Sequence, residues 1–257
     1  MLNSTLIQRI EVTPELLIVR IKPDAGVPDF KPGQYVALGL PGGARRYEGA
    51  APEVQAPAAD KLIKRAYSIG SSPEQRDFLE FYIAVVPTGS LTSRLAALRE
   101  GDRLFAQPKV TGTFTLEGIP ENRNLVLVST GTGLAPFMSM VRTGAVWAPS
   151  RKITVVHGVR YPSDFAYADE LSSYQESGKG LCYLPIASRA GDDYTGRKGR
   201  IQRLFEDKLV YPNPEEDSVF LCGNPAMIED LGRYLCERGF VLHSKKTPGN
   251  LHVEKYW

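Results

Sequence analysis

Cysteine and histidine are scarce in this chain of 257 residues, which limits the metal chemistry that it can support. The three cysteines, Cys182, Cys222 and Cys236, are scattered and do not have the spacing of a metal site. An iron–sulfur cluster needs four thiolates, and three histidines in total argue against zinc. An odd number of dispersed cysteines also favours a reducing compartment over a disulfide framework. We therefore expect no metal site.

The chain also lacks a strong excess of one charge and any long apolar run. Its formal net charge of +2 argues against bulk binding to nucleic acid, which usually requires a strong basic stripe. No uninterrupted apolar run is long enough to span a bilayer, and the first residues lack the charged start and apolar stretch of a signal peptide. We expect a cytoplasmic monomer that binds neither nucleic acid nor a membrane.

The motifs of nucleophilic and acid–base catalysis are missing too. The sequence has no G-x-S-x-G elbow, no paired carboxylates at a suitable spacing and no pattern of a histidine-based triad. This absence favours chemistry that belongs to a bound cofactor, which the protein positions and tunes.

Short strand-like runs dominate the chain up to about Leu116. Residues 16–21, 34–40 and 78–86 are rich in β-branched or alternating apolar residues, and Gly and Pro turns separate them. This pattern predicts a small antiparallel barrel, with one helical stretch over residues 90–98. The Ala- and Pro-rich segment from Gly42 to Asp60 is expected to be an exposed, mobile loop.

From about Glu117 the pattern changes to apolar strands that alternate with helix-like stretches. Continuous apolar runs of this kind predict parallel strands that helices cover on both faces. We expect a β-barrel domain over residues 1–117 and a doubly wound α/β domain over residues 118–257. The predicted strands of the second domain cover residues 125–129, 153–159, 182–187 and 219–222.

Two segments have the chemistry of nucleotide sites. Arg65-Ala66-Tyr67-Ser68 offers a guanidinium, an aromatic face and a hydroxyl, a set that suits a flat redox-active ring with a pyrophosphate. Gly131-Thr132-Gly133-Leu134-Ala135-Pro136 follows an apolar strand and opens a helix, as a phosphate-binding turn does. By itself this second motif is equally compatible with an ordinary strand-to-helix turn.

The acidic residue that binds the ribose of NAD after such a turn is missing. The next two strands end instead at Arg160 and Arg189, with Arg197 and Arg200 downstream. Guanidinium groups at the carboxyl ends of strands suit a 2′-phosphate, which favours NADP over NAD. Any one of these arginines alone is better explained as a solvated surface charge.

Two further segments are unusual. Cys222-Gly223-Asn224-Pro225 ends a predicted strand, where a small thiol can pack beside a nicotinamide ring or simply be a buried structural cysteine. Glu254-Lys255-Tyr256-Trp257 ends the chain on two large aromatic residues. This tail either stacks on a flat cofactor or packs on its own core.

In this order and spacing, the segments resemble those of the bacterial, plant-type ferredoxin–NADP reductases, which are flavoenzymes with an FAD barrel and an NADP domain. The likeness extends over nearly the whole chain, although the segment from Gly42 to Asp60 looks longer than in close relatives. The resemblance implies an FAD-dependent enzyme that moves electrons between NADP(H) and a small carrier. Ferredoxin and flavodoxin are both acidic, and the sequence does not distinguish them.

The resemblance also implies roles for individual residues. Tyr67 would stack on the isoalloxazine ring, Arg65 would hold the pyrophosphate and the Ser68 hydroxyl would approach N5. The other residues implied for FAD are Ala66, Tyr82, Ser90, Leu91, Thr92, Thr132, Tyr256 and Trp257. Those implied for NADP are Val159, Arg160, Ser188, Arg189, Arg200, Gly223, Asn224 and Pro225, where Arg200 fits the family pattern better than Arg197. The candidate catalytic residues are Ser68, Cys222 and Glu254.

Two other functions stay open from the sequence. One is the NADH-dependent reductase arm of an oxygenase, although such proteins normally carry a fused cluster domain whose cysteines are absent here. The other is a nucleotide-binding regulatory or electron-transfer subunit without enzymatic activity. Flavin content and reduction of an artificial acceptor would separate the enzymes from this last alternative.

Overall fold

The computed structural model describes residues 1–256, and Trp257 lies outside the described part. The chain divides into two compact units. The first contains Met1–Thr115 together with Met138–Thr143, and the second contains Leu116–Phe137 and the chain from Gly144 onward.

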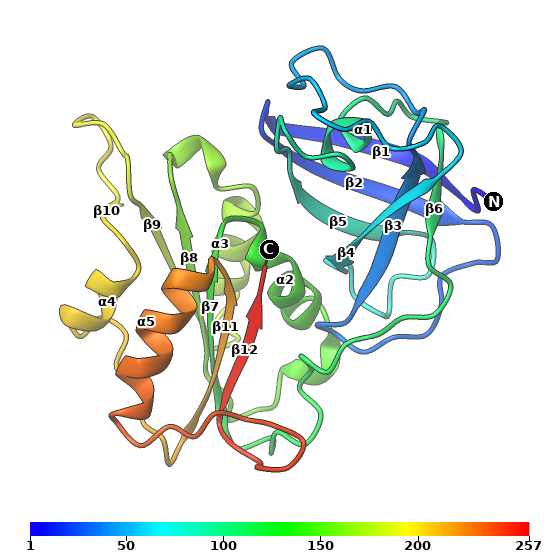
Figure 1. Ribbon diagram of the computed structural model, residues 1–257. Coiled ribbons are helices and arrows are strands. Elements are labelled where there is room, and N and C mark those ends of the chain that lie inside the picture. The colour runs from blue at the N-terminus through cyan, green and yellow to red at the C-terminus, as the bar shows by residue number, and fades with distance from the viewer. Residues whose placement is uncertain (257) are drawn as a thin grey trace. The chain divides into compact units, whose positions relative to one another are not determined.

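The first unit is built on a six-stranded sheet whose paired strands are antiparallel (Figure 1). The strand order is β4-β3-β6-β1-β2-β5. Side chains from all six strands meet in one apolar core, in which Leu38, Phe81 and Leu104 are fully buried. This barrel-like sheet confirms the antiparallel fold that the sequence predicts. The strands are β1 (Ser4–Thr13), β2 (Leu16–Pro23), β3 (Tyr35–Pro41), β4 (Leu62–Ser68), β5 (Leu79–Ala84) and β6 (Arg103–Ala106).

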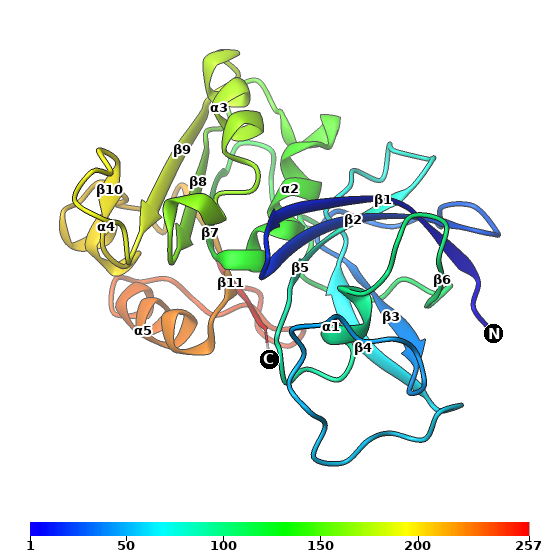
Figure 2. The same cartoon turned by 90° about the horizontal axis from the view of Figure 1, so that it is seen from above.

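One short helix, α1 (Thr92–Leu95), lies in the first unit. It is shorter than the expected stretch 90–98, but Leu91 and Leu95 are buried in the core as the spacing predicts. The segment 42–60 runs beside this helix in both views (Figures 1 and 2). The sequence predicts a mobile loop there, whereas hydrogen bonds tie the segment to α1 in the structure.

The second unit contains six parallel strands in the order β10-β9-β8-β7-β11-β12. Helix α3 covers one face of this sheet, while α4 and α5 cover the other (Figure 2). This arrangement confirms the doubly wound fold. The strands are β7 (Asn124–Thr130), β8 (Ile153–Val159), β9 (Leu181–Ala187), β10 (Arg197–Lys198), β11 (Asp217–Gly223) and β12 (Leu251–Lys255).

Short helices follow the strands of the second sheet. The 3-10 turn η1 (Gly131–Leu134) leads directly into α2 (Ala135–Val141), so Pro136 lies in the first helical turn as expected. The remaining helices are α3 (Ala168–Glu176), α4 (Gln202–Glu206) and α5 (Pro225–Cys236), with 3-10 turns η2 (Gly144–Val146) and η3 (Pro162–Asp164). Within residues 1–256, no helix is long and apolar enough to cross a membrane.

Candidate functional site

Arg65-Ala66-Tyr67-Ser68 forms the carboxyl end of β4 in the first unit. In this strand Arg65 is exposed and Ser68 is buried, while half-buried Tyr67 packs against the barrel core. Just after the strand, the amide of Gly70 donates to the carbonyl of Glu80 at 2.8 Å, which brings this end of β4 alongside β5.

The electrostatic surroundings keep these side chains in defined protonation states. Burial raises the pKa of the Tyr67 phenol, while the Arg65 guanidinium acts in the opposite direction, so Tyr67 stays protonated at neutral pH. Within residues 1–256, Arg65 uses only Nη1, which donates to the Lys64 carbonyl at 2.7 Å. The exposed remainder of the guanidinium is available for an anionic group.

The second predicted flavin segment surrounds the start of α1. Tyr82 is buried in β5, and Leu91 is buried in the core at the amino end of the helix. The Thr92 hydroxyl donates to the Val86 carbonyl and accepts from the Val86 amide, both at 3.2 Å. Leu91 and Thr92 therefore shape the turn, which presents Ser90 and the backbone of the first helical residues.

Glycines allow the phosphate-type turn to pack directly against the end of β11. A Cβ on Gly133 would lie 2.5 Å from the Cys222 carbonyl oxygen, so only glycine fits there. Gly223 has φ +127° and lies against Thr130, whose hydroxyl accepts from the Asn224 amide at 2.8 Å. Two motifs that are about ninety residues apart therefore meet at one edge of the sheet, as the parallel topology predicts.

His157 lies beneath this turn, and no motif in the sequence points to a role for it. Its ring is completely buried in β8, and Nε2 is 3.2 Å from the carbonyl oxygen of Gly131. Burial lowers the pKa of His157 to about 4, although the bond to Gly131 partly opposes the shift. The neutral ring with a proton on Nε2 donates to the turn and packs edge-on against Phe165. In the sequence, His157 is one residue of an apolar strand, and nothing in that pattern indicates this contact.

Glu254 and Lys255 of the predicted tail lie in β12 (Leu251–Lys255), at the edge of the second sheet. Glu254 pairs with Cys222 in register, and the Tyr256 amide donates to the Gly223 carbonyl at 3.0 Å. Burial and, secondarily, the Glu254 carboxylate raise the pKa of the Cys222 thiol, whereas the Tyr256 side chain acts in the opposite direction; the net shift is upward. Cys222 is thus a neutral thiol. Trp257, for which the sequence predicts a contact with FAD, lies outside the described residues.

The three predicted phosphate arginines lie at the carboxyl ends of neighbouring strands. The Arg189 amide donates to the Arg160 carbonyl at 2.7 Å, and the Gly199 amide donates to the Ala187 carbonyl at 3.0 Å just before Arg200. All three side chains are exposed, and none of them makes an ion pair within residues 1–256. The set is therefore free to bind an anion.

Four other predicted NADP residues have structural partners. Ser188 donates through its amide and its hydroxyl to the Val159 carbonyl, at 2.9 and 3.2 Å, and the Val159 side chain is buried. Asn224 caps α5 by accepting from the Ala226 and Met227 amides, and Pro225 follows at the first helical position. Among the residues predicted for FAD, Thr132 is buried in η1.

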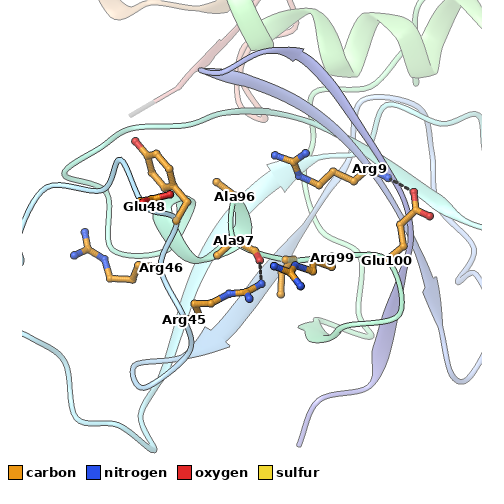
Figure 3. Close-up of a pocket in the computed structure, with 10 residues that line it drawn as sticks. Arg9, Arg45, Arg46, Glu48, Ala96, Ala97, Arg99 and Glu100 are labelled. Carbon is orange, nitrogen blue, oxygen red and sulfur yellow. Dashed lines mark hydrogen bonds between the residues drawn. The ribbon is translucent and has the colours of Figure 1, made fainter.

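A separate hollow of about 600 Å³ opens in the first unit, and Figure 3 shows the side chains around it. None of the predicted cofactor residues lines it. Arg9, Arg45, Arg46 and Arg99 give it a basic wall, with Glu48 and Glu100 between them. The hollow lies between the segment 42–60 and the residues that follow α1.

Both units match known protein domains. Residues 4–112 match the family model described as "Oxidoreductase FAD-binding domain", and residues 127–232 match that described as "Oxidoreductase NAD-binding domain". The chain is 35% identical over 239 residues to ferredoxin–NADP reductase of Pseudomonas aeruginosa, covering 88% of this chain and 86% of the relative.

Other relatives agree with this pattern. Flavodoxin/ferredoxin–NADP reductase of Escherichia coli is 31% identical over 240 residues, which cover 91% of this chain and 90% of that protein. Among solved structures, a ferredoxin NADP+ reductase from Neisseria gonorrhoeae with bound FAD and NADP has a TM-score of 0.82 and 26% identity. The match covers 98% of this chain and 97% of that one.

Proposed function

Since this chain belongs to the ferredoxin–NADP reductase family, we propose that it is an FAD-dependent oxidoreductase that transfers electrons between NADP(H) and a small one-electron carrier. The carrier is a ferredoxin or a flavodoxin, as the names of the relatives state for those proteins. FAD is held by the first unit and NADP by the second.

One observation supports the NADP part of the proposal most strongly. Exposed guanidiniums at Arg160, Arg189 and Arg200, without an ion pair in the described residues 1–256, lie at the carboxyl edge of the same sheet that carries the glycine turn. Ligands of open parallel sheets bind at this edge. A 2′-phosphate is the group that would use such charges, because guanidinium and phosphate form bidentate, charge-assisted bonds.

The first unit has the donor set that FAD requires. Arg65 offers an exposed guanidinium that uses one nitrogen among residues 1–256, and half-buried Tyr67 offers an aromatic ring two residues away. The turn at Ser90 leads directly into α1 (Thr92–Leu95). We propose that Arg65 and the turn hold the pyrophosphate, that Tyr67 stacks on the ring and that Ser68 approaches N5. Ala66, Tyr82, Leu91 and Thr92 shape the same site.

The second unit would bind the nicotinamide nucleotide. Bound FAD would accept a hydride from NADPH and release electrons singly, which is why a one-electron carrier needs a flavin. We propose that the neutral Cys222 thiol and Gly223 border the nicotinamide ring. Glu254, in register with Cys222, would serve as an electrostatic or proton partner. Thr132, Tyr256 and Trp257 are proposed to contact the flavin.

Steady-state kinetics with purified protein test this proposal. We expect NADPH to support reduction of ferricyanide and of a ferredoxin or flavodoxin, and NADH to support both poorly. A colourless protein that reduces no acceptor with either nucleotide would contradict the proposal and favour a regulatory subunit. The monomeric state and the cytoplasmic location are proposals that size-exclusion chromatography and cell fractionation test.

A further inference from the structure

The segment 42–60 is closed at its base and forms a strap beside α1. The amide of Gly42 donates to the Lys61 carbonyl at 2.8 Å, and that of Gly43 donates to the Ala59 carbonyl, also at 2.8 Å. Hydrogen bonds therefore join the two ends of the strap, and its middle passes beside α1. Figures 1 and 2 both show it beside that helix.

Arg94 anchors the strap from the helix side. The residue is only 2% exposed, and its guanidinium uses all three nitrogens. Nη1 donates to Glu53 Oε1 at 2.7 Å and Nη2 donates to Glu53 Oε2 at 2.9 Å, which is a bidentate ion pair. Nε donates to the Gly42 carbonyl at 3.1 Å, and Nη1 also donates to the Ser90 carbonyl at 2.7 Å. One buried cation thus joins the start of the strap, its middle and the predicted flavin segment.

Arg46, which belongs to the strap, makes a second contact with α1. Its Nε donates to Ser93 Oγ at 3.1 Å, and its Nη2 donates to the Ala51 carbonyl at 2.6 Å. Two backbone hydrogen bonds reinforce this contact. The Tyr47 amide donates to the Ser93 carbonyl at 2.9 Å, and the Ala51 amide donates to the Pro87 carbonyl at 3.0 Å. The strap is therefore bound along residues 87–94, on both sides of Ser90.

We propose that the strap fixes the loop at Ser90–Thr92 in the conformation that binds the FAD phosphates, with Glu53 and Arg94 as its latch. Arg94 is a positioning residue here, because its contact is with the Ser90 carbonyl and with the strap. The inference rests on the proposed function, since it assigns the FAD phosphates to this loop. The latch could not be predicted from the sequence, because the two partners are 41 residues apart and the strap has little pattern.

The latch is held by charge. Arg94 lowers the pKa of Glu53, mainly through its side-chain hydrogen bonds, so the carboxylate is ionised at neutral pH. Removing the charge of Glu53 would leave a buried guanidinium without its anion, which is strongly unfavourable. The strap would then separate from α1 more readily, and Ser90 would lose the constraint on its carbonyl.

The Glu53→Gln variant tests the latch because it keeps size and shape but removes the charge. Glu11→Gln is the matched control, since Glu11 forms an exposed pair with Arg9 at 3.1 Å on the same unit. FAD release from the full-length holoprotein is followed by the rise of free-flavin fluorescence. We expect Glu53→Gln to release FAD about tenfold faster, equivalent to about 1.4 kcal/mol, and Glu11→Gln to match wild type.

Two further readouts separate the latch from a general loss of structure. Thermolysin should cut before exposed Val54 faster in Glu53→Gln than in the control, and binding of NADP+ by the second unit should be unchanged. Arg46→Gln removes the other anchor and should release FAD faster as well, even if Glu53→Gln folds poorly. Wild-type release rates in both variants would overturn the inference and leave the proposed function intact. A wild-type chain that binds no FAD would overturn both.

Discussion

We propose that the exposed guanidiniums of Arg160, Arg189 and Arg200, none of which makes an ion pair within residues 1–256, decide which nucleotide the second unit accepts. Because Arg189 and Arg200 are exposed and have no acidic partner within residues 1–256, their replacement leaves no buried charge behind and should act on the ligand alone. We expect Arg189→Ala or Arg200→Ala to raise the KM for NADPH about tenfold, since a hydrogen bond to a charged group contributes about 1.5–3 kcal/mol before solvent screening. The KM for NADH should change little.

Arg197 supplies the control for this prediction. It is an exposed arginine in β10, three residues from Arg200, and the sequence left both as candidates for the phosphate. Arg197→Ala should leave the KM for NADPH near its wild-type value. Equal losses with NADPH and NADH in the Arg200 variant would show a structural role instead.

Buried His157 makes the stability of the chain depend on pH. Its pKa falls from its ordinary 6.5 to about 4 in the folded chain, so the unfolded chain binds more protons between these values. Stability is therefore present above pH 6.5 and is lost as the pH falls toward 4. This one group should cost about 2 kcal/mol between pH 7 and pH 5.

Urea unfolding at the two pH values measures this loss. The variant His157→Gln should be less stable at pH 7, but its stability should fall by less on going to pH 5. His252, whose pKa burial also lowers to about 4, accounts for part of the remaining dependence. A pH dependence identical in wild type and His157→Gln would contradict this role.

The arginines were predictable and His157 was not, for a physical reason. Residues at the carboxyl ends of parallel strands come together by topology alone, so Arg160 and Arg189 follow from the strand pattern. The bond from His157 to Gly131 depends on which side chain lies under the turn, and packing of this kind has no sequence period. The partnership of Arg94 with Glu53 is hidden for the same reason.

The close approach of η1 to β11 should tolerate no side chain at Gly133. Gly133→Ala would force a Cβ to 2.5 Å from a backbone oxygen, so the turn or the strand must shift. We expect a loss of about 1–3 kcal/mol in the free energy of unfolding together with weaker NADPH binding. Gly232→Ala on α5 is the control, because nothing lies near its added Cβ, and it should gain about 0.5–1 kcal/mol. Equal stability of the two variants would show that η1 does not need this contact.

Strand β12 places Tyr256 beside Cys222, where we propose that the tail covers the position of the nicotinamide. Deleting Tyr256 and Trp257 should therefore tighten NADP+ binding about two- to tenfold, since an aromatic stack is worth about 0.5–1.5 kcal/mol. The flavin absorption spectrum should change as well. Tyr256→Phe is the control, because it keeps the ring and removes only the hydroxyl. Unchanged affinity and spectra after the deletion would exclude a gate.

Strands with continuous or alternating apolar residues were predictable, as β2, β3, β7 and β8 show. Strands β4 and β12 escaped prediction because the former carries charged residues and the latter has mixed polarity at the chain end. Their pairing with β3 and β11 decides their structure, which local propensity does not encode. The tail and the flavin motif therefore appeared in the sequence as isolated segments rather than as strand ends.

The whole chain combines two sheets that each build one nucleotide site. The antiparallel unit carries Arg65, Tyr67 and the turn at Ser90, and the parallel unit carries the glycine turn, Cys222 and the arginines. The change near Glu117 from short alternating strands to continuous apolar strands predicted one antiparallel and one parallel sheet. The central claim is that electrons enter from NADPH and reach a flavin held by this chain.

Anaerobic stopped-flow spectroscopy of the purified holoprotein tests that claim most directly. We expect a yellow protein whose flavin absorbance, near its visible maximum, decreases rapidly on mixing with NADPH. With an equal concentration of NADH the absorbance should decrease much more slowly. Arg200→Ala should slow only the NADPH reaction. A flavin that NADPH does not bleach, or that both nucleotides bleach equally fast, would contradict the account.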